Sequence, residues 1–216
     1  MRTALILGAC ACLAMQAVGQ ELKEVPLPRP RMTGGKPLMD ALRERHSTRS
    51  FDSRLLPPQT LSDLLWAAFG INRPESGKRT APSAVNWQEI DIYVVLASGA
   101  YRYDPQPHSL KRIAHGDLRK LTGGQDFVAT APVNLVFVAD LTKMSGASPE
   151  DQLFYAATDT GFISQNVYLF CASEGLATVV RGMVDREALA KALKLPPTSK
   201  IILAQTVGFP AEEEKK

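Results

Sequence analysis

A single long helix in the second half of the chain constrains the fold most strongly. Ser148-Pro149-Glu150 has the residues of a helix start, and no further proline follows before Glu174, so we expect a helix of about 25 residues. Small side chains in the middle of its apolar face let another backbone approach closely. A helix this apolar needs a covering partner, so we expect a second copy of the chain to pack against Glu150–Glu174. The face consists of Phe154, Ala157, Gly161, Ser164, Tyr168 and Cys171.

The remaining periodicity predicts an α+β fold around a central sheet. Val133–Ala139 is almost entirely apolar, which indicates a strand covered on both faces. Ile71–Thr80 is polar and contains Pro74 and Gly77, so we expect a loop there. Other strands are expected at Ile90–Ala97, Tyr101–Tyr103, Ser109–Ile113, Leu176–Val184 and Lys200–Val207, and other helices at Leu38–Arg45, Pro57–Gly70 and Asp185–Leu193.

Length and charge narrow the class of protein. A chain of 216 residues can form one domain with a well-buried core. The formal net charge is only +3 and no long run of Lys or Arg occurs, which argues against nucleic acid as a partner. His46, His108 and His115 are scattered over expected loops with no cysteine or carboxylate at ligand spacing, so we expect no metal site.

The N-terminus has the pattern of a secretory signal. Arg2 precedes an apolar stretch, and Ala17 and Gly19 are the small residues that signal peptidase requires. We expect a cleavable signal peptide over residues 1–19 and export, to the periplasm, with a buried N-terminal helix as the alternative. The apolar stretch is too short for a stable membrane span. Residues 20–35 are then an extended Pro-rich linker, 36–210 the domain and 211–216 a disordered charged tail.

Cleavage would leave one cysteine in the mature chain. Cys10 and Cys12 lie in the expected signal, which leaves Cys171 on the apolar face of the long helix. A free cysteine in such a position behaves as a small apolar residue, so we assign it no nucleophilic role.

The five residues from Arg45 to Arg49 carry the strongest chemical signal. A guanidinium and the Ser47 hydroxyl can bind a phosphate through charge-assisted hydrogen bonds. In an extended backbone, residues two positions apart point the same way, so Arg45, Ser47 and Arg49 share one side. A solvated basic loop is the alternative interpretation for these residues alone.

Further blocks in the same order favour a specific family. Three blocks resemble the nitroreductase-like flavoproteins, whose members bind FMN. They are Arg45–Arg49, Arg79–Gln88 and Asp159–Leu169, the last of which runs into Gly175-Leu176. The resemblance covers about Lys36 to Pro210 and implies a nitroreductase-like α+β fold with a mixed or antiparallel central sheet. It also implies a homodimer with FMN at the interface and the long helix at its centre. Tyr101–Pro105 and Gly116–Arg119 are similar to the SagB-type branch, the azoline oxidases of peptide maturation.

This resemblance assigns cofactor-binding roles to the first block. Arg45, His46 and Ser47 match cofactor contacts, with Arg45 and Ser47 at the phosphate. Arg49 matches the basic position that faces N1 and O2 of the flavin ring. Negative charge collects at this edge on reduction, so a cation there would favour the reduced state. The alternative for Arg49 is a surface ion pair with Asp52 or Glu44.

The other two blocks match the surroundings of the ring. Pro82, Ser83 and Asn86 match the loop that meets the ring, usually from the partner subunit, although Asn86 also suits an ordinary turn. Arg181, Gly182 and Met183 match the segment whose backbone N–H faces N5, and Gly182 would permit close approach.

The sequence departs from the family pattern at two places. Gln88 is followed by Glu89 where the nitroreductases used for comparison have Pro-Trp. Acidic residues follow Gly208-Phe-Pro210, where many relatives carry Lys or Arg to complete the phosphate site. Asp159 and Gln165-Asn166 are interpreted as polar groups of a subunit interface rather than an active-site cluster.

The resemblance implies an FMN-dependent oxidoreductase with ping-pong transfer through flavin N5, from a reduced donor such as NAD(P)H to a small organic acceptor. No side chain is expected to be catalytic, because the flavin performs the redox step. Two alternatives remain: a SagB-like flavin oxidase or dehydrogenase of azoline-type or other substrates, and a non-enzymatic flavin-binding electron carrier. Because nicotinamide pools are expected inside the cell, export leaves a donor other than NAD(P)H open as well.

Overall fold

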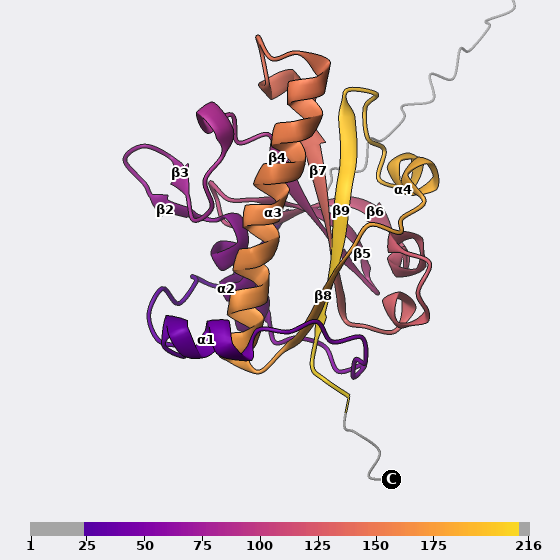
Figure 1. Ribbon diagram of the computed structural model, residues 1–216. Helices are drawn as coiled ribbons and strands as arrows, with labels where there is room; N and C mark the ends of the chain where they lie inside the picture. Colours follow the sequence, from indigo (N-terminus) through magenta and orange to yellow (C-terminus); the bar gives the residue numbers. More distant parts are fainter. Residues whose placement is uncertain (1–23, 212–216) are drawn as a thin grey trace, which may run out of the picture.

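A seven-stranded antiparallel sheet organises the molecule (Figure 1). The structure, a computed structural model, describes residues 24–211. The strand order is β1-β6-β5-β4-β7-β9-β8, so β8 lies at one edge and every neighbouring pair is antiparallel. The strands are β1 (Glu24–Pro26), β4 (Ile90–Leu96), β5 (Gly99–Asp104), β6 (Ser109–His115), β7 (Val133–Asp140), β8 (Ala177–Arg181) and β9 (Ser199–Gly208).

Helices cover both faces of this sheet. On one face lie α1 (Leu38–Glu44), α2 (Pro58–Phe69) and α3 (Pro149–Glu174), with α3 crossing the sheet next to β8 and β9 (Figure 1). The other face carries α4 (Arg186–Ala192) and two short 3-10 turns, η2 (Arg119–Thr122) and η3 (Asp126–Ala129). These layers confirm the α+β fold with an antiparallel central sheet that the sequence predicts.

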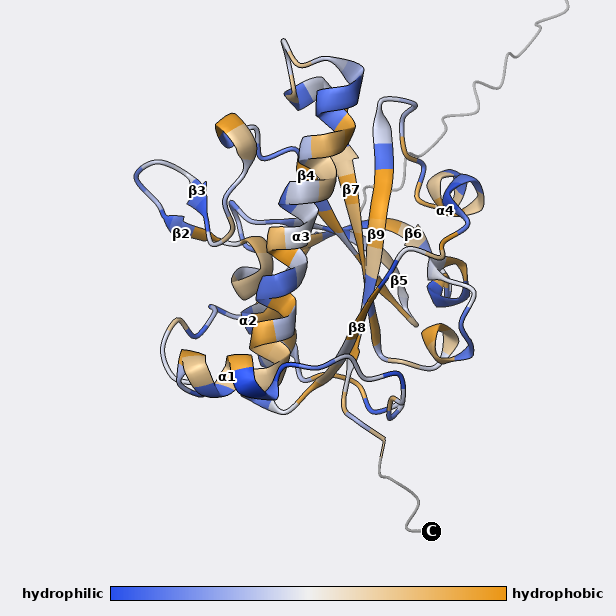
Figure 2. Ribbon diagram, viewed as in Figure 1, coloured by the Kyte–Doolittle hydropathy of each residue, from blue (hydrophilic) through white to orange (hydrophobic). Residues whose placement is uncertain are grey.

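The central strand β7 explains the two-layer packing. Seven of its eight residues are buried, and its two faces belong to different apolar clusters. Leu135 and Phe137 pack with α2 and α3, whereas Val136 and Val138 pack with Leu189 of α4. The prediction of a strand covered on both faces is confirmed, and Figure 2 shows hydrophobic colour along β7 and β9 between the helical layers.

The long helix begins and ends where the sequence indicates. The Ser148 side chain accepts a hydrogen bond from the Asp151 N–H at 3.1 Å, and Gly175 ends the helix in the left-handed conformation at φ 69°. Its expected apolar face divides into two parts, however. Ser164, Tyr168 and Cys171 are buried against the sheet, whereas Phe154, Ala157 and Gly161 lie on a side of the N-terminal half that no described element covers.

The segment expected to be a linker is part of the fold from Glu24 onward. Its backbone is extended, but Glu24–Pro26 pairs with β6, and Arg31 binds Asp63 of α2. Buried Asp63 accepts hydrogen bonds from the Arg31 N–H and Nε at 2.7 and 2.8 Å. These contacts hold the residues as a strap across the domain, so a free linker is the wrong description for residues 24–35.

Two smaller expectations also need correction. Ile71–Thr80 is not an irregular loop but a short hairpin of β2 (Ile71–Arg73) and β3 (Lys78–Arg79) that projects from the body in Figure 1. The strand expected over Leu176–Val184 is shorter, since the β8–β9 pairing ends at Arg181 and the Val184 N–H donates to the Gly182 carbonyl.

The expected signal peptide and residues 212–216 of the tail lie outside the described residues. Among helices of the described region, none combines the length and apolar character that crossing a bilayer requires.

Candidate functional site

The basic loop Arg45–Arg49 packs against the C-terminal half of α3 and the free edge of β8. The Ser47 Oγ lies 2.8 Å from the Tyr168 hydroxyl, which also accepts the Val180 N–H at 3.0 Å. The Arg45 guanidinium stacks over the Tyr168 ring, 5.3 Å from its centroid. Tyr168 therefore links the loop to the edge strand. Exposed His46 points its Nδ1 at the Glu44 carbonyl, 2.6 Å away.

The two arginines of this loop have no carboxylate partner in the described part of the chain. The carboxylates proposed as alternatives for Arg49 are already paired. Glu44 binds Lys36 and Asp52 binds Arg54, each with a 2.6 Å contact. Arg45 and Arg49 thus remain available to an anionic ligand, which favours the phosphate-binding interpretation over a surface ion pair.

The outward-facing backbone groups of β8 continue from this loop. Alternate residues of an edge strand point their N–H and C=O away from the sheet. The Thr178 carbonyl accepts the Thr48 N–H at 2.9 Å, and the Val180 N–H is taken by Tyr168. Gly182 is next in this alternation, and no acceptor for its N–H is found among residues 24–211. A free donor therefore lies where the sequence places the group that faces flavin N5.

Arg181 differs from its two neighbours because its side chain points into the protein. It is 5% exposed and donates to the Thr122 carbonyl at 2.7 Å, to Asn134 Oδ1 at 3.1 Å and to Thr206 Oγ1 at 3.0 Å. Burial lowers the pKa of this guanidinium to about 10, so it stays charged at neutral pH. Any contact of Arg181 with a cofactor is therefore limited to its backbone.

A cavity of about 920 Å³ opens beside Gly182 and Met183. Gly123, Gly124 and Gln125 form its opposite wall. The Arg181 guanidinium fills the space that a side chain on residue 123 would need. Gln125 Oε1 is buried and has no partner in the described structure, so it can accept a ligand N–H.

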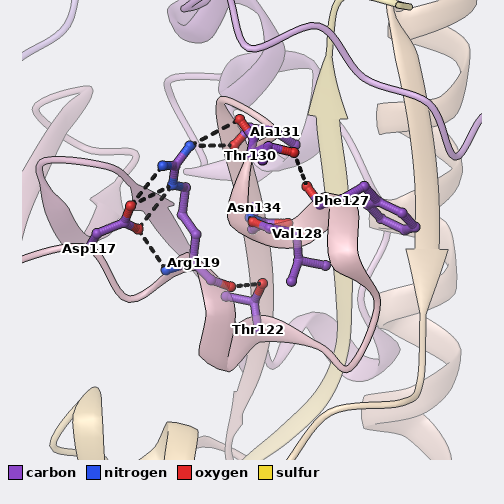
Figure 3. Close-up of polar contacts among 8 residues, drawn as sticks. All are labelled: Asp117, Arg119, Thr122, Phe127, Val128, Thr130, Ala131 and Asn134. Atoms are coloured by element: carbon purple, nitrogen blue, oxygen red, sulfur yellow. Dashed lines mark hydrogen bonds and ion pairs between the residues drawn. The ribbon is translucent and has the colours of Figure 1, made fainter.

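Arg119 fixes the loop that carries this wall (Figure 3). Its guanidinium lies between the Asp117 carboxylate, at 2.7 Å from Nη2, and the carbonyls of Thr130 and Ala131, at 3.1 and 2.9 Å from Nη1. Asn134 of β7 adds a hydrogen bond to the Val128 carbonyl at 2.8 Å. The loop is thus held on the sheet at both ends.

The second predicted group, Pro82, Ser83 and Asn86, lies near the N-terminal half of α3. Asp159 of α3 accepts the Ala84 N–H at 2.8 Å. The backbone around it is unusual, because Val85, Asn86 and Gln88 all have left-handed φ values of 50–60°. Val85 is 83% exposed at the loop tip. Contacts with buried residues are therefore needed to hold this strained backbone in place.

Glu89 provides one of these contacts. It is fully buried, and its Oε2 accepts a hydrogen bond from Ser83 Oγ at 3.2 Å, while Oε1 has no partner among the described residues. Burial and the neighbouring Asp159 carboxylate raise the pKa of Glu89 to about 7. The departure from Pro-Trp noted in the sequence therefore introduces a buried, protonatable group beneath the loop.

One protomer does not bring the two groups together. Tyr168 and Asp159 are nine residues apart on α3, which corresponds to roughly 13 Å along a helix at 1.5 Å per residue. The basic loop and Gly182 lie at one end of this interval, and the Pro82–Asn86 loop at the other. The sequence did not single out Tyr168, Gln125 or Arg119 as site residues, because their roles depend on long-range packing.

The Tyr101–Pro105 block belongs to a different region. Tyr103 OH lies 2.9 Å from His108 Nδ1, and His108 Nε2 lies 2.7 Å from Ser62 Oγ, which donates to the Pro28 carbonyl. These bonds join the β5–β6 hairpin to α2 and the N-terminal strap. The block therefore has a structural role on the described chain.

Comparison with known proteins identifies the family. The family model described as the nitroreductase family matches residues 42–209. A protein of Methanocaldococcus jannaschii assigned as a nitroreductase is 32% identical over 168 residues, 73% of this chain and 84% of its own. The FMN reductase [NAD(P)H] of Bacillus subtilis is 23% identical over 83% of this chain and 68% of its own.

Solved structures give the same assignment. A protein of Ralstonia eutropha described as a nitroreductase has a TM-score of 0.84 and 47% identity, over 90% of this chain and 93% of its own. The Escherichia coli microcin synthetase McbBCD complex shares the fold, with a TM-score of 0.69 and 22% identity over 94% of this chain and 84% of that chain. Fold and relatives together define an oxidoreductase of the flavin-dependent class. The chain belongs to the nitroreductase family.

Replacement of Glu89 by Gln should change how stability depends on pH. A carboxyl whose pKa rises from 4.5 to about 7 on folding holds its proton more tightly in the folded state. Its penalty is absent below pH 4.5 and grows as the pH rises to about 7, up to roughly 3 kcal/mol. Glu89→Gln should therefore gain stability relative to wild type at pH 8.5 but not at pH 4.5. Urea unfolding at both pH values measures this, and a stability difference independent of pH would contradict it.

Proposed function

We propose that this chain is an FMN-dependent oxidoreductase that passes electrons from a reduced donor such as NAD(P)H to a small organic acceptor, in two separate half-reactions. The observation that carries the proposal is the row of available groups along the β8 edge. Arg45 and Arg49 are without carboxylate partners in the described chain, and the Gly182 N–H without an acceptor.

These groups fit the three parts of FMN. Arg45 and Ser47 would bind the phosphate through charge-assisted hydrogen bonds. Arg49 would face the N1–O2 edge, and the buried acceptor Gln125 Oε1 suits a ring N–H. FMN, when bound, supplies hydride chemistry at N5, and the chain supplies binding, orientation and a positive environment. No side-chain nucleophile is required.

We propose further that the active form is a homodimer. The uncovered side of α3 exposes Leu153, Phe154 and Phe162, and α1 exposes Leu38 and Met39. Both helices lie on the same side of the sheet (Figures 1 and 2). A partner that covered these apolar side chains could also bring its own Pro82–Asn86 loop to the β8 edge, which would reunite the two groups separated on one protomer.

A nicotinamide donor is supported by the Bacillus subtilis relative, whose name states NAD(P)H. The azoline-oxidase alternative rested on the Tyr101–Pro105 block, which the hydrogen bonds of Tyr103 and His108 explain structurally. Similarity to the microcin synthetase complex shows a shared fold only and does not indicate a shared substrate. We therefore favour the reductase.

Export to the periplasm, inferred from residues 1–19, remains part of the proposal. N-terminal sequencing of the secreted protein should give a chain that begins near Gln20.

The purified protein should be yellow and bleach rapidly with NADH or NADPH in stopped-flow absorbance. Arg45→Ala should weaken FMN binding about tenfold or more, because one charge-assisted phosphate bond contributes roughly 1.5–3 kcal/mol. Arg54→Ala is a matched control, because Arg54 is paired with Asp52 outside the site. Colourless protein that does not take up FMN would refute the central proposal, and flavin inert to both nucleotides would exclude them as donors.

Arg49→Leu should keep its FMN but make it harder to reduce. Charge develops at the N1–O2 edge on reduction, so the lost cation acts mainly on the reduced state. A loss of about 1.4 kcal/mol in the two-electron couple lowers the midpoint potential by about 30 mV. A redox titration beside wild type measures the shift. An unchanged potential, or simple loss of flavin, would show that Arg49 has another role.

The mature chain should be a dimer in light scattering, and Phe154→Asp with Phe162→Asp should dissociate it. Both side chains are exposed on α3, at 63% and 45%, so the charges should disturb a dimer contact and not the fold of a protomer. Met32→Asp is the control, an exposed apolar residue of the strap. A wild-type monomer with bound FMN would contradict the shared site.

A further inference from the structure

The β2–β3 hairpin forms a basic hollow beside the Pro82–Asn86 loop. Arg73 and Lys78 from the hairpin, with Arg79, line a hollow of about 220 Å³. The same hollow is lined by Pro82, Ser83 and Asn86, the residues proposed to meet the flavin ring. Three cations and the ring-facing loop therefore share one concave surface.

The cations of the hollow are bound only to neutral groups. Arg73 donates from Nε to Asn72 Oδ1 at 3.0 Å and from Nη2 to the Arg79 carbonyl at 2.6 Å. Arg79 donates from Nε to Gln88 Oε1 at 2.8 Å and from Nη1 to the Phe69 carbonyl at 3.0 Å. Its guanidinium also lies over the Phe69 ring, 4.9 Å from the centroid.

Carboxylates do not compensate this charge within residues 24–211. Lys111 and Lys143, on the neighbouring part of the sheet, pair with Asp104 and Asp91, whereas none of the three hollow cations has an ion pair. Glu75, in the turn of the same hairpin, makes no ion pair with them. The hollow thus concentrates three positive charges that form no ion pair among the described residues.

The pKa of Arg79 shows that its charged form is disfavoured in this hollow. Burial lowers its pKa, and the more distant Tyr103, Asp91 and Asp104 offset the effect only in part. A partly buried cation without a counter-charge is unfavourable unless a ligand provides that charge. The existing hydrogen bonds fix both guanidiniums but leave Arg79 Nη2, Arg73 Nη1 and Lys78 Nζ without a partner in the described structure.

We propose that this basic hollow is an anion subsite, which holds the carboxylate or phosphate group of a small redox substrate next to the flavin. Planar guanidiniums with free donors suit such oxygen anions. A hollow of about 220 Å³ has room for an anionic group and an adjoining ring but not for a whole dinucleotide. The inference rests on the proposed function, because the flavin is located by the Pro82–Asn86 loop.

The test compares ligands that differ in charge but little in shape. Binding of 4-nitrobenzoate and 4-nitrobenzyl alcohol to the purified oxidised protein is measured by calorimetry at low salt, without reductant. NADP⁺ and NAD⁺ form a second pair that differs by one phosphate. The variant is Arg73→Gln with Lys78→Gln, both exposed residues. The matched control is Lys191→Gln with Lys200→Gln, which removes the same charge from exposed residues outside the hollow.

We expect the hollow variant to weaken binding of 4-nitrobenzoate or of NADP⁺ about fivefold or more, with a smaller effect on the paired ligand, 4-nitrobenzyl alcohol or NAD⁺, and no effect of the control variant. An effect on 4-nitrobenzoate assigns the subsite to an acceptor carboxylate, and an effect on NADP⁺ assigns it to the donor phosphate. Equal affinities of variant and wild type for both 4-nitrobenzoate and NADP⁺, or equal losses for the two members of each pair, would overturn the subsite. Absorbance of the same samples reports FMN content separately, so colourless protein identifies a failure of the proposed function instead.

Discussion

The free edge of β8 is the constraint on which the site depends. An edge strand offers backbone groups at every second residue, and this chain uses them in sequence. The Thr48 N–H of the basic loop donates to the Thr178 carbonyl, and the Val180 N–H donates to the Tyr168 hydroxyl. The Gly182 N–H is the next outward-facing donor. Under the proposed function, the strand therefore sets the spacing between the phosphate-binding end and the ring-facing end. Among the described residues, a Cβ at 182 would meet only Leu203 Cδ2, at 3.8 Å, so packing does not require glycine there; under the proposed function, the missing side chain leaves this last donor accessible to the flavin.

Uncompensated positive charge is the second theme of the structure. Arg181 is buried with three neutral acceptors, Arg79 is partly buried with two, and Arg45 and Arg49 have no carboxylate partner among residues 24–211. Some other cations form ion pairs, as Arg31 with Asp63 and Arg119 with Asp117, and exposed ones such as Lys191 and Lys200 form none within the described chain. A partly buried cation without an ion pair, such as Arg79, costs stability, so we propose that anionic ligands compensate the charge beside the Pro82–Asn86 loop and along the β8 edge.

Local patterns predicted the elements but not the contacts between distant segments. The Ser148 cap, Gly175 and the apolar run of β7 act over a few residues, and each was recognised from the sequence. Glu24–Pro26 looked like a free linker because its strand partner, β6, begins 83 residues after Pro26, at Ser109. Tyr168 counted only as part of a helix face, since its bonds to Ser47 and Val180 arise from the packing of α3 against the edge strand. The anomaly at Glu89 was visible in the sequence, but its burial next to Asp159 was not.

The long helix α3 explains how such a site could be shared by two copies of the chain. It carries Tyr168, which fixes the basic loop Arg45–Arg49, and Asp159, which fixes the Pro82–Asn86 loop, on one rigid element. In a twofold dimer the same surface meets itself, so each α3 would contribute one half to each of two sites. Covering Phe154 and Phe162 would then be coupled to completing the cofactor site, because both changes require the same approach of the partner helix. Exposed apolar side chains on α3 and divided site residues are, in this arrangement, two consequences of one interface.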